Sequence, residues 1–274
     1  MKKLFFFIGL VIGTQGDILA QTQKKHTLFN PVPREKMREM STDRPDITES
    51  PYSVDAGHFQ LETDLFKTSR NKADGITTIE NNINLANLKL GLSKNIDFQL
   101  VVGSYVDMYQ KDVNGNKANS SKGLGDLTLR LKYNLWGNDG GKTAFAMMPY
   151  INFPTSKDQT YTTAGIVFPL GVDLGNDFSF GTQVQFDWLK SVAKAGYHGS
   201  ILQSATIGKE LTESLGTFIE SYYVYDFEEE KAQASFNGGL SYSVTPNLKF
   251  DVGFNLGITK NTDKVYFIGF SFRY

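Results

Sequence analysis

The chain has 274 residues, no cysteine, and 28 Lys and Arg against 29 Asp and Glu, which leave a net charge of −1. A near-neutral chain lacks the basic surface of a non-specific nucleic-acid binder, and the lack of cysteine excludes disulfides, thiolate metal sites and cysteine nucleophiles. After the N-terminal stretch, no run of residues is apolar enough for a membrane-spanning helix. The 26 glycines and 13% aromatic residues favour an all-β fold.

The first 20 residues have the pattern of a secretory signal peptide. Lys2 and Lys3 form a basic start, the stretch 4–13 is apolar but too short to cross a bilayer, and the small Ala20 ends the segment. We therefore expect a signal peptide over residues 1–20, cleavage after Ala20, and export of the mature chain from the cytoplasm. A buried first helix is the alternative.

An irregular polar arm is predicted over residues 21–57, because four of the eight prolines lie before residue 52. The arm carries an acidic cluster that contains one arginine: Asp43, Arg44, Pro45, Asp46, Glu49 and Pro51. Carboxylate oxygens suit calcium, but calcium loops space their ligands more densely and include a Gly. We interpret the cluster as local turns in which Arg44 pairs with a neighbouring carboxylate, and we expect neither a metal nor a cofactor.

From Phe59 onward apolar and polar residues alternate with period two, the pattern of strands with one apolar face. The clearest segment places Leu127, Leu129, Leu131, Tyr133 and Leu135 on one face, opposite Asp126, Thr128, Arg130, Lys132 and Asn134. The alternation predicts about twelve strands over residues 58–274, uncertain by about two. Longer loops are expected at 68–78, 109–122 and 189–198, and a change of phase after Leu85 indicates either a bulge or burial on both faces of that strand.

Three features favour a membrane barrel over a soluble sandwich. The strands run about 10–14 residues, long enough for a tilted span. The faces opposite the apolar rows carry charges and amides, as in a wet lumen. The last strand forms an outward row, Tyr266, Ile268, Phe270, Phe272 and Tyr274, whose Phe270, Phe272 and Tyr274 resemble the C-terminal signal read by the outer-membrane insertion machinery. We predict an all-β, transmembrane, antiparallel up-and-down β-barrel, with the lipid bilayer of a Gram-negative outer membrane as its surroundings.

Several motifs resemble one family of outer-membrane transporters, labelled "MetA-pathway of phenol degradation". They are TDRPDITESPYSV at 42–54, GHFQLE at 57–62, GLGDL at 123–127 and TPNL at 245–248. The resemblance extends over 42–274. Residues 153–156 depart from it, because family members often carry Pro-Thr-Gly there. The resemblance implies a monomeric or small oligomeric barrel that passes small molecules, aromatic or hydrophobic compounds among them.

Seven charged residues should face the lumen and tune its selectivity: Asp126, Arg130, Lys132, Asp187, Glu220, Lys249 and Asp251. Alternatively, they pair across a narrow lumen and seal a structural or surface-binding barrel. Our main hypothesis is a passive or gated channel for a small-molecule solute, without nucleic-acid partner. We further hypothesise that the arm folds against or into the periplasmic mouth and restricts the pore.

A barrel hydrolase is the alternative from another class, because His198 and Ser200 lie two residues apart and therefore on one face of a strand. No Asp or Asn can be assigned to orient the imidazole, so we expect no enzyme. Residues 228–230 read as a solvated loop tip. A set of aromatic residues suits interfacial girdles, with a packed core as the alternative: Tyr222, Tyr223, Tyr225, Tyr242, Tyr266 and Trp188.

Overall fold

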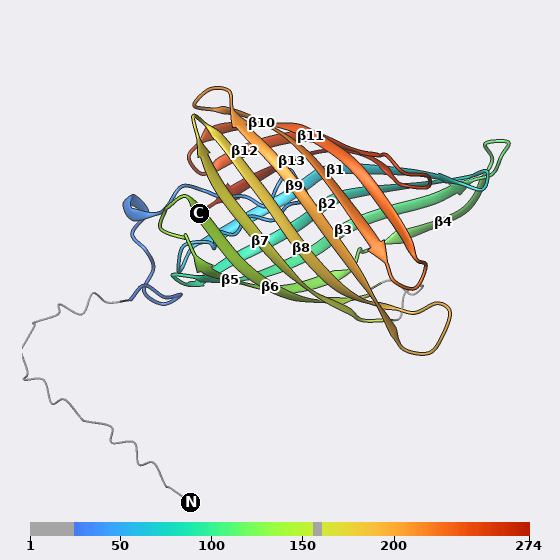
Figure 1. The fold of residues 1–274 in the computed structure, drawn as a ribbon, viewed down its shortest axis with the longest axis horizontal. Coiled ribbons are helices and arrows are strands. Elements are labelled where there is room, and N and C mark those ends of the chain that lie inside the picture. The colour runs from blue at the N-terminus through green and yellow to red at the C-terminus, as the bar shows by residue number, and fades with distance from the viewer. Residues whose placement is uncertain (1–24, 156–160) are drawn as a thin grey trace, which may run out of the picture.

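The computed structural model describes residues 25–155 and 161–274 (Figure 1). The predicted signal peptide lies outside the described residues. Within them the chain forms a 3₁₀ helix, η1 (Arg34–Lys36), and thirteen strands: β1 (Phe59–Ala73), β2 (Ile76–Ser93), β3 (Ile96–Lys111), β4 (Lys117–Gly123), β5 (Leu127–Trp136), β6 (Thr143–Phe153), β7 (Thr163–Gly175), β8 (Phe178–Lys190), β9 (Tyr197–Glu210), β10 (Leu215–Asp226), β11 (Lys231–Thr245), β12 (Leu248–Gly257) and β13 (Lys264–Arg273). No helix among the described residues is long and apolar enough to cross a membrane.

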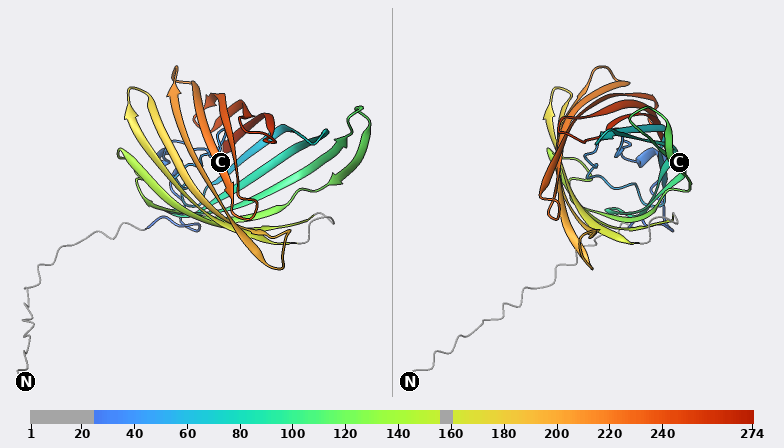
Figure 2. Two further views of the ribbon diagram at one scale, coloured as in Figure 1. Left: turned by 45° about the vertical axis from the view of Figure 1, so that its right-hand side comes forward. Right: turned by 90° about the vertical axis from the view of Figure 1, so that its right-hand side faces the viewer.

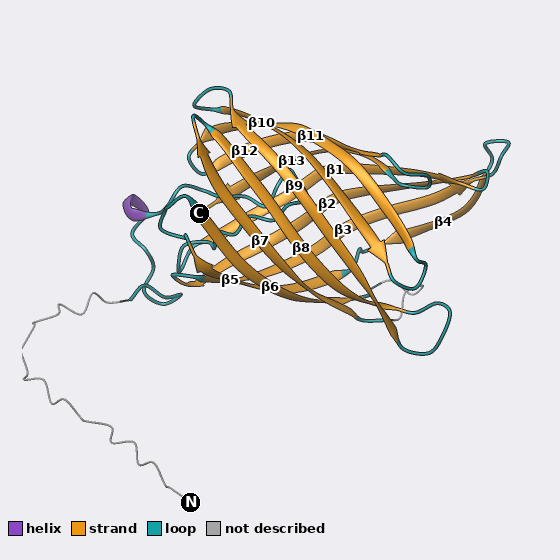
Figure 3. Cartoon of the chain, viewed as in Figure 1, coloured by secondary structure: helices purple, strands orange, loops and turns teal. Residues whose placement is uncertain are grey.

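All thirteen strands belong to one antiparallel sheet in which neighbours in sequence pair, except that β5 pairs with β3 rather than β4. The first strand, β1, pairs with the last, β13, over Gln60–Arg70 and Lys264–Arg273. This pairing closes the sheet into a barrel, and β4 is an extra strand that lengthens one side (Figures 1 and 3). The predicted up-and-down barrel of about twelve strands is confirmed.

The barrel wall is polar inside and apolar outside, the inverse of a soluble protein. On β5 the Lys132 side chain is buried at 1% exposure, whereas its neighbour Leu131 is 42% exposed. The same contrast recurs around the barrel, where the largest fully buried side chains include Lys89, Gln99 and Glu220. An exposed belt of leucines and aromatics is stable only against hydrocarbon, so the outer surface is the lipid-facing one.

The outward row of the last strand is also present. Tyr266, Ile268, Phe272 and Tyr274 are exposed on the outer face of β13, while Ser271 and Arg273 between them are buried toward the lumen. Phe272 lies between Leu61 of β1 and Leu248 of β12 in the sheet register. The strand therefore has two partners and presents no free edge, which removes the aggregation hazard of an apolar terminal strand.

Two predicted loops are strand in the structure. Residues 68–78 form the paired ends of β1 and β2 around a turn at Asp74 and Gly75, and residues 109–122 contain the end of β3 and most of β4. These segments are rich in Lys, Asn, Ser and Thr and show no alternation. Backbone pairing needs no apolar face where both sides of a hairpin are solvated, so the hydrophobic pattern could not reveal it. The loop at 189–198 is shorter than expected, between Lys190 and Tyr197.

The two ends of the barrel differ. The N-terminal end of β1 and the C-terminal end of β13 share one end with short turns such as 94–95, 176–177 and 246–247. Because outer-membrane barrels have short periplasmic turns and longer extracellular loops, this end is the periplasmic one. The change of phase near Leu85 coincides with Asn84, which adopts a left-handed backbone with φ 55°. The pairing of β2 with β1 and with β3 keeps its register there, and the bulge in this region lies on β1, whose register with β13 shifts between Asp64 and Phe66.

Candidate functional site

The described part of the arm, residues 25–57, begins outside the periplasmic end of the barrel, where η1 lies (Figure 1), and then enters the lumen. Viewed along the barrel, the blue arm lies inside the ring of strands (Figure 2). Met40, Asp43, Thr48 and Ser53 are all buried there. Between Arg44 and Ile47 the arm separates two cavities, one of about 440 Å³ on the extracellular side, lined by Ile47, and one of about 410 Å³ on the periplasmic side, lined by Arg44 and Pro45.

Asp43 is the centre of the deepest ion cluster. Its Oδ1 accepts from Lys132 Nζ at 2.7 Å, and its Oδ2 pairs with Lys89. Glu62 of β1 also pairs with Lys89, and its Oε2 accepts from the backbone N–H groups of Asp43 at 2.9 Å and Arg44 at 3.1 Å. Two buried ammonium groups thus meet two carboxylates, which satisfies the condition under which buried charges are tolerated.

Arg44, the residue after Asp43, forms the second cluster. Its guanidinium donates to Asp251 of β12 from Nε (3.1 Å) and Nη2 (2.5 Å), and to Asp64 of β1 from Nη1 (2.5 Å). The predicted pairing within the arm is therefore wrong, because both partners of Arg44 lie on the barrel wall. Gly269 of β13 makes room for this contact, since a Cβ there would lie 2.3 Å from Nη2.

Glu220 of β10 binds the next part of the arm. Its carboxylate accepts from the backbone N–H of Ile47 (2.9 Å), and from both the N–H (2.8 Å) and the hydroxyl (2.6 Å) of Thr48. The Thr48 hydroxyl also lies 2.6 Å from that of Ser204 on β9. The arm therefore contacts strands on opposite sides of the sheet order, from β1 to β10, and bridges the lumen.

Glu49 and Pro51 extend these contacts toward β5 and β8. Glu49 accepts from Arg130 Nη1 at 2.7 Å through Oε1, and its N–H donates to Gln183 at 2.7 Å. The carbonyl of Pro51 accepts from Asn134 at 2.8 Å. Four of the seven candidate lumen charges, Arg130, Lys132, Glu220 and Asp251, therefore bind the arm.

The other three candidates do not contact the arm. Asp126 accepts from Asn152 (3.2 Å) and from the N–H of Thr155 (3.3 Å) beside the β4–β5 connection. Asp187 accepts from Tyr150 and from Gln185 (2.9 Å) on the inner wall. Lys249 is half-buried on β12 and forms no ion pair with another described residue. Asp126, Asp187 and Lys249 are therefore not part of the arm cluster.

The base of the arm is fixed at the seam between β1 and β13. Arg38 donates to Asp55 from Nε at 2.7 Å, and Arg273 of β13 donates to the carbonyl of Arg38 at 2.8 Å. The Asp55 carbonyl lies so close to Gly91 of β2 that a Cβ there would be only 2.0 Å away. Hence the arm base packs against wall backbone, and no side chain fits between them.

The pKa values of two arm carboxylates, Asp43 and Glu49, are shifted in opposite directions. Burial raises the pKa of Asp43, but the charges of Lys132 and Lys89 outweigh it, so that the net shift is below the ordinary value of 3.8. Burial and the charge of Asp43 raise the pKa of Glu49 from 4.5 to about 7, against the opposing charges of Arg130 and Lys132. Asp43 is therefore an anion at neutral pH, whereas Glu49 titrates near neutrality.

His198 and Ser200 do not form a hydrolase pair. The imidazole lies 3.0 Å from Asp226 through Nε2 and 3.0 Å from Glu228 through Nδ1, so both nitrogens face carboxylates. No hydrogen bond joins it to Ser200, although both residues are described. No Asp could be assigned to the imidazole from the sequence, and the structure supplies one, because strand pairing brings Asp226 beside it. Glu228 likewise is no free loop tip, since it also binds Ser191.

Candidate metal ligands are not gathered in the described residues. No group of three or more His, Asp or Glu side chains there is arranged to hold a metal ion. The acidic residues of the arm are separated by their basic partners: Asp43 faces lysines, Glu49 faces Arg130, and Asp46 lines the periplasmic cavity. The arm cluster is an ion-pair network that ties one segment to the wall.

Sequence reasoning missed four of the wall residues that bind the arm: Glu62, Asp64, Lys89 and Gln183. The signal was present for three of them, because Gln60, Glu62 and Asp64 alternate with apolar residues on β1, and Gln183 does so on β8. Lys89 lies after Leu85, where the alternation changes phase. Tyr222 was assigned to the outer aromatic girdle, but it shares the lumen face of β10 with Glu220 and lines the extracellular cavity.

Comparison with known proteins decides the family. A family model described as "Putative MetA-pathway of phenol degradation" matches residues 42–274. The chain belongs to this family. The match includes the arm from Thr42 onward, so the segment that enters the lumen lies within the family span together with the barrel. A search of curated proteins found no match.

Two solved structures with the same fold are an outer-membrane channel and a porin. The COG4313 outer membrane channel from Pseudomonas putida F1 aligns with a TM-score of 0.62 at 10% identity, covering 85% of this chain and 100% of that one. The NanC porin aligns with a TM-score of 0.51 at 12% identity, covering 77% of this chain and 98% of that one. The protein is thus an outer-membrane β-barrel of a Gram-negative bacterium, with the fold of small-molecule channels.

Proposed function

We propose that this family member is a gated outer-membrane channel for small molecules, in which the arm is the gate. The observation that carries the proposal is the position of residues 44–47, which separate an extracellular cavity from a periplasmic one inside a single lumen. A solute that crosses the barrel must pass this segment. In the docked state the arm restricts the pore, and passage requires that the arm moves.

The chemistry of the contacts supports a movable gate. Arm and wall meet through many ion pairs and hydrogen bonds, such as Arg44 with Asp251 and Thr48 with Glu220. Polar groups in a wet lumen can exchange protein partners for water, so undocking costs less than the exposure of an equally large apolar surface. The lumen charges that bind the arm would then line the open path and tune its selectivity.

A disulfide lock tests the gate directly, because the natural chain has no cysteine. Thr48→Cys combined with Ser204→Cys would join the arm to β9 where the two hydroxyl oxygens now lie 2.6 Å apart. We expect the oxidised double variant to lose single-channel openings and the reduced form to regain them. Thr259→Cys with Thr262→Cys is the matched control, since these hydroxyls are 2.7 Å apart within one extracellular loop.

Deletion of residues 22–50 is the complementary experiment. It should raise the conductance severalfold and remove any effect of oxidation. If the oxidised T48C/S204C protein and the deletion variant both conduct like the wild type, the arm is not a gate and the proposal fails.

The hydrolase is the second candidate function, and the geometry disfavours it. His198 cannot act as a base for Ser200 while both nitrogens of its imidazole face carboxylates. We therefore propose that the protein is not an enzyme. The family description names a phenol pathway, so phenol is a natural first solute for transport assays.

A further inference from the structure

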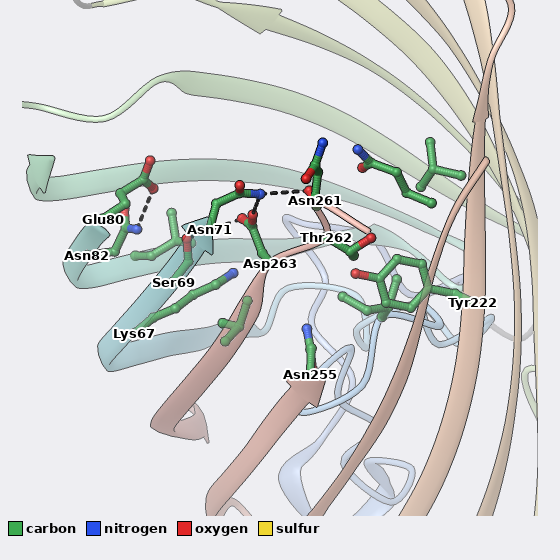
Figure 4. Close-up of a pocket in the computed structure, with 15 residues that line it drawn as sticks. Lys67, Ser69, Asn71, Glu80, Asn82, Tyr222, Asn255, Asn261, Thr262 and Asp263 are labelled. Carbon is green, nitrogen blue, oxygen red and sulfur yellow. Dashed lines mark hydrogen bonds between the residues drawn. The ribbon is translucent and has the colours of Figure 1, made fainter. Parts of the chain in front are cut away.

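The extracellular cavity has the chemistry of a binding site for a hydroxylated solute. Its lining residues come from six neighbouring strands and their ends, β2, β1, β13, β12, β11 and β10, and from Ile47 of the arm. Its volume of about 440 Å³ falls in the range of about 300–1,000 Å³ found for small-molecule sites. Most of the groups that face it are polar, and Figure 4 shows them converging from several strands.

The carboxylates of the cavity are held in place by wall amides. Asp263 accepts from Asn71 at 2.7 Å and from Ser69 at 3.2 Å, and Glu80 accepts from Asn82 at 2.7 Å (Figure 4). Each carboxylate has about four lone-pair positions, so acceptor capacity remains on both. They are therefore oriented acceptors for a donor that enters the cavity.

Two further donors of the cavity, Lys67 and Asn255, are free to bind a ligand. Lys67 forms no ion pair with another described residue, and Asn255, only 6% exposed, makes no side-chain hydrogen bond to one. Both side chains line the cavity, where a ligand or water can satisfy their hydrogen-bonding groups. In the sheet register Lys67 lies opposite Phe267 and Asn255 opposite Val265, so both are nearer the periplasmic end than Asp263. Ile47 of the arm lines the same cavity.

A neutral saccharide matches this set of groups better than an aromatic compound. Hydroxyl groups both donate and accept, and can therefore serve oriented carboxylates, an ammonium and an amide within one small volume. The ring of Tyr222 offers an apolar face to the C–H groups of a sugar ring. An aromatic hydrocarbon would remove water from the same polar groups without replacing its hydrogen bonds, and a polyanion would meet Glu80 and Asp263.

We propose that this cavity is a saccharide-binding site, at which a neutral mono- or disaccharide waits on the extracellular side of the docked arm. The inference rests on the proposed channel function, since the site lies in the same lumen, and it names the substrate class that the channel selects. Ligand contacts with Ile47 would further couple occupancy of the site to the position of the arm.

Calorimetric titration of the purified full chain in detergent tests the proposal with glucose, maltose and sucrose as probes. We expect saturable binding of at least one sugar. The affinity should fall about tenfold or more in Asn255→Leu, which removes the hydrogen bond of a neutral amide to the sugar, and in Asp263→Asn, which removes the hydrogen bond of a charged carboxylate. Asn119→Leu is the matched control, since Asn119 is exposed on β4 and lies outside the cavity. Heat-modifiable migration checks that each variant is folded.

Two results would overturn the proposal: none of the three sugars binds to folded wild-type protein, or phenol binds instead and loses affinity in Asn255→Leu. Binding in detergent does not need conduction. A channel that conducts but binds no sugar therefore refutes the saccharide site alone, whereas a sugar-binding protein whose conductance ignores the disulfide lock refutes the gate alone.

Discussion

Arg44 of the arm and Asp251 of β12, 207 positions apart in sequence, form a two-point ion pair inside the lumen, with N–O distances of 3.1 and 2.5 Å. The second carboxylate at this guanidinium, Asp64, comes from β1 on the other side of the β1–β13 seam. Arg44 thus joins a strand from the beginning of the barrel to one near its end. The planar guanidinium, with five N–H donors, suits this contact with two carboxylates better than the single ammonium group of a lysine.

Removal of the Arg44 charge should undock the arm. Breaking a buried ion pair by deleting one partner costs about 3–5 kcal/mol, because the remaining charges stay buried. Arg44→Gln should therefore raise the conductance and speed the proteolysis of the arm, in the direction of the 22–50 deletion. Arg70→Gln is the control, since Arg70 is exposed on the same strand as Asp64. Equal conductance and equal proteolysis in the two variants would contradict the importance assigned to Arg44.

A methyl group at Gly269 should displace the same guanidinium from the wall side. The added Cβ would lie 2.3 Å from both Arg44 Nη2 and the carbonyl of Thr63, so Gly269→Ala should destabilise the barrel by about 1–3 kcal/mol and loosen the arm. Gly123→Ala has open space around its Cβ and serves as the control. The temperature at which the band on a gel becomes heat-modified measures stability, and proteolysis measures docking. A Gly269→Ala protein as stable and as protected as Gly123→Ala would be evidence against this contact.

Docking of the arm should be strongest in mildly acidic solution because of Glu49. The pKa of Glu49 is raised from 4.5 to about 7, chiefly by burial, so its stabilising contribution is complete below 4.5 and is lost as the pH rises through about 7. We expect conductance to increase above neutrality in the wild type. In Glu49→Gln, which cannot ionise, this rise should disappear; a persisting rise would assign the effect to another group.

Asp43 predicts the opposite behaviour in strong acid. Its pKa is below 3.8 because the charges of Lys132 and Lys89 outweigh the effect of burial. The contribution of this lowered group is present above the ordinary pKa and is lost as the pH falls through the folded-state value. Arm proteolysis or conductance should therefore rise again below about pH 4. Asp43→Asn should be undocked over the whole range, and a wild-type-like profile in that variant would exclude this mechanism.

The C-terminal row should direct assembly as well as closure. Phe272→Ser combined with deletion of Tyr274 removes two exposed aromatics from the outer face of β13, and we expect less protein in the heat-modifiable, outer-membrane fraction. Phe29→Ser removes an exposed aromatic from the arm and should leave that fraction unchanged. Normal yield of the β13 variant would refute the role of this row as an insertion signal.

The barrel could be predicted from the sequence because each strand residue faces either lipid or the lumen, and this contrast fixes its polarity. Leu127 to Leu135 alternate with charges, and a lipid-facing wall with a wet lumen requires that pattern at every strand. The solvated hairpin ends at 68–78 and 109–122 lack it, because no solvent contrast exists across them. Tyr222 shows the remaining ambiguity: an aromatic residue suits either an interface or a lumen, and only its register with Glu220 decides.

The contacts of the arm could not be predicted, because none is local. Asp43 meets Lys89 and Lys132, which are 46 and 89 positions away, and no periodicity in an irregular segment says which wall residues it reaches. The predicted pairing of Arg44 within the arm followed from proximity in sequence. A carboxylate outside the arm wins because the barrel presents Asp64 and Asp251 already oriented and shielded from water.

The seam between β1 and β13 has a consequence for biogenesis. The arm leads directly into β1 and is tied to the last strand through Arg273, so the segment that fills the lumen is anchored where the first and last strands must meet. A barrel that closed with its arm outside would bury Lys132 without the carboxylate of Asp43. Closure of the barrel and insertion of the arm are therefore linked: the charged residues of the lumen find their partners only when the barrel closes around the N-terminal arm.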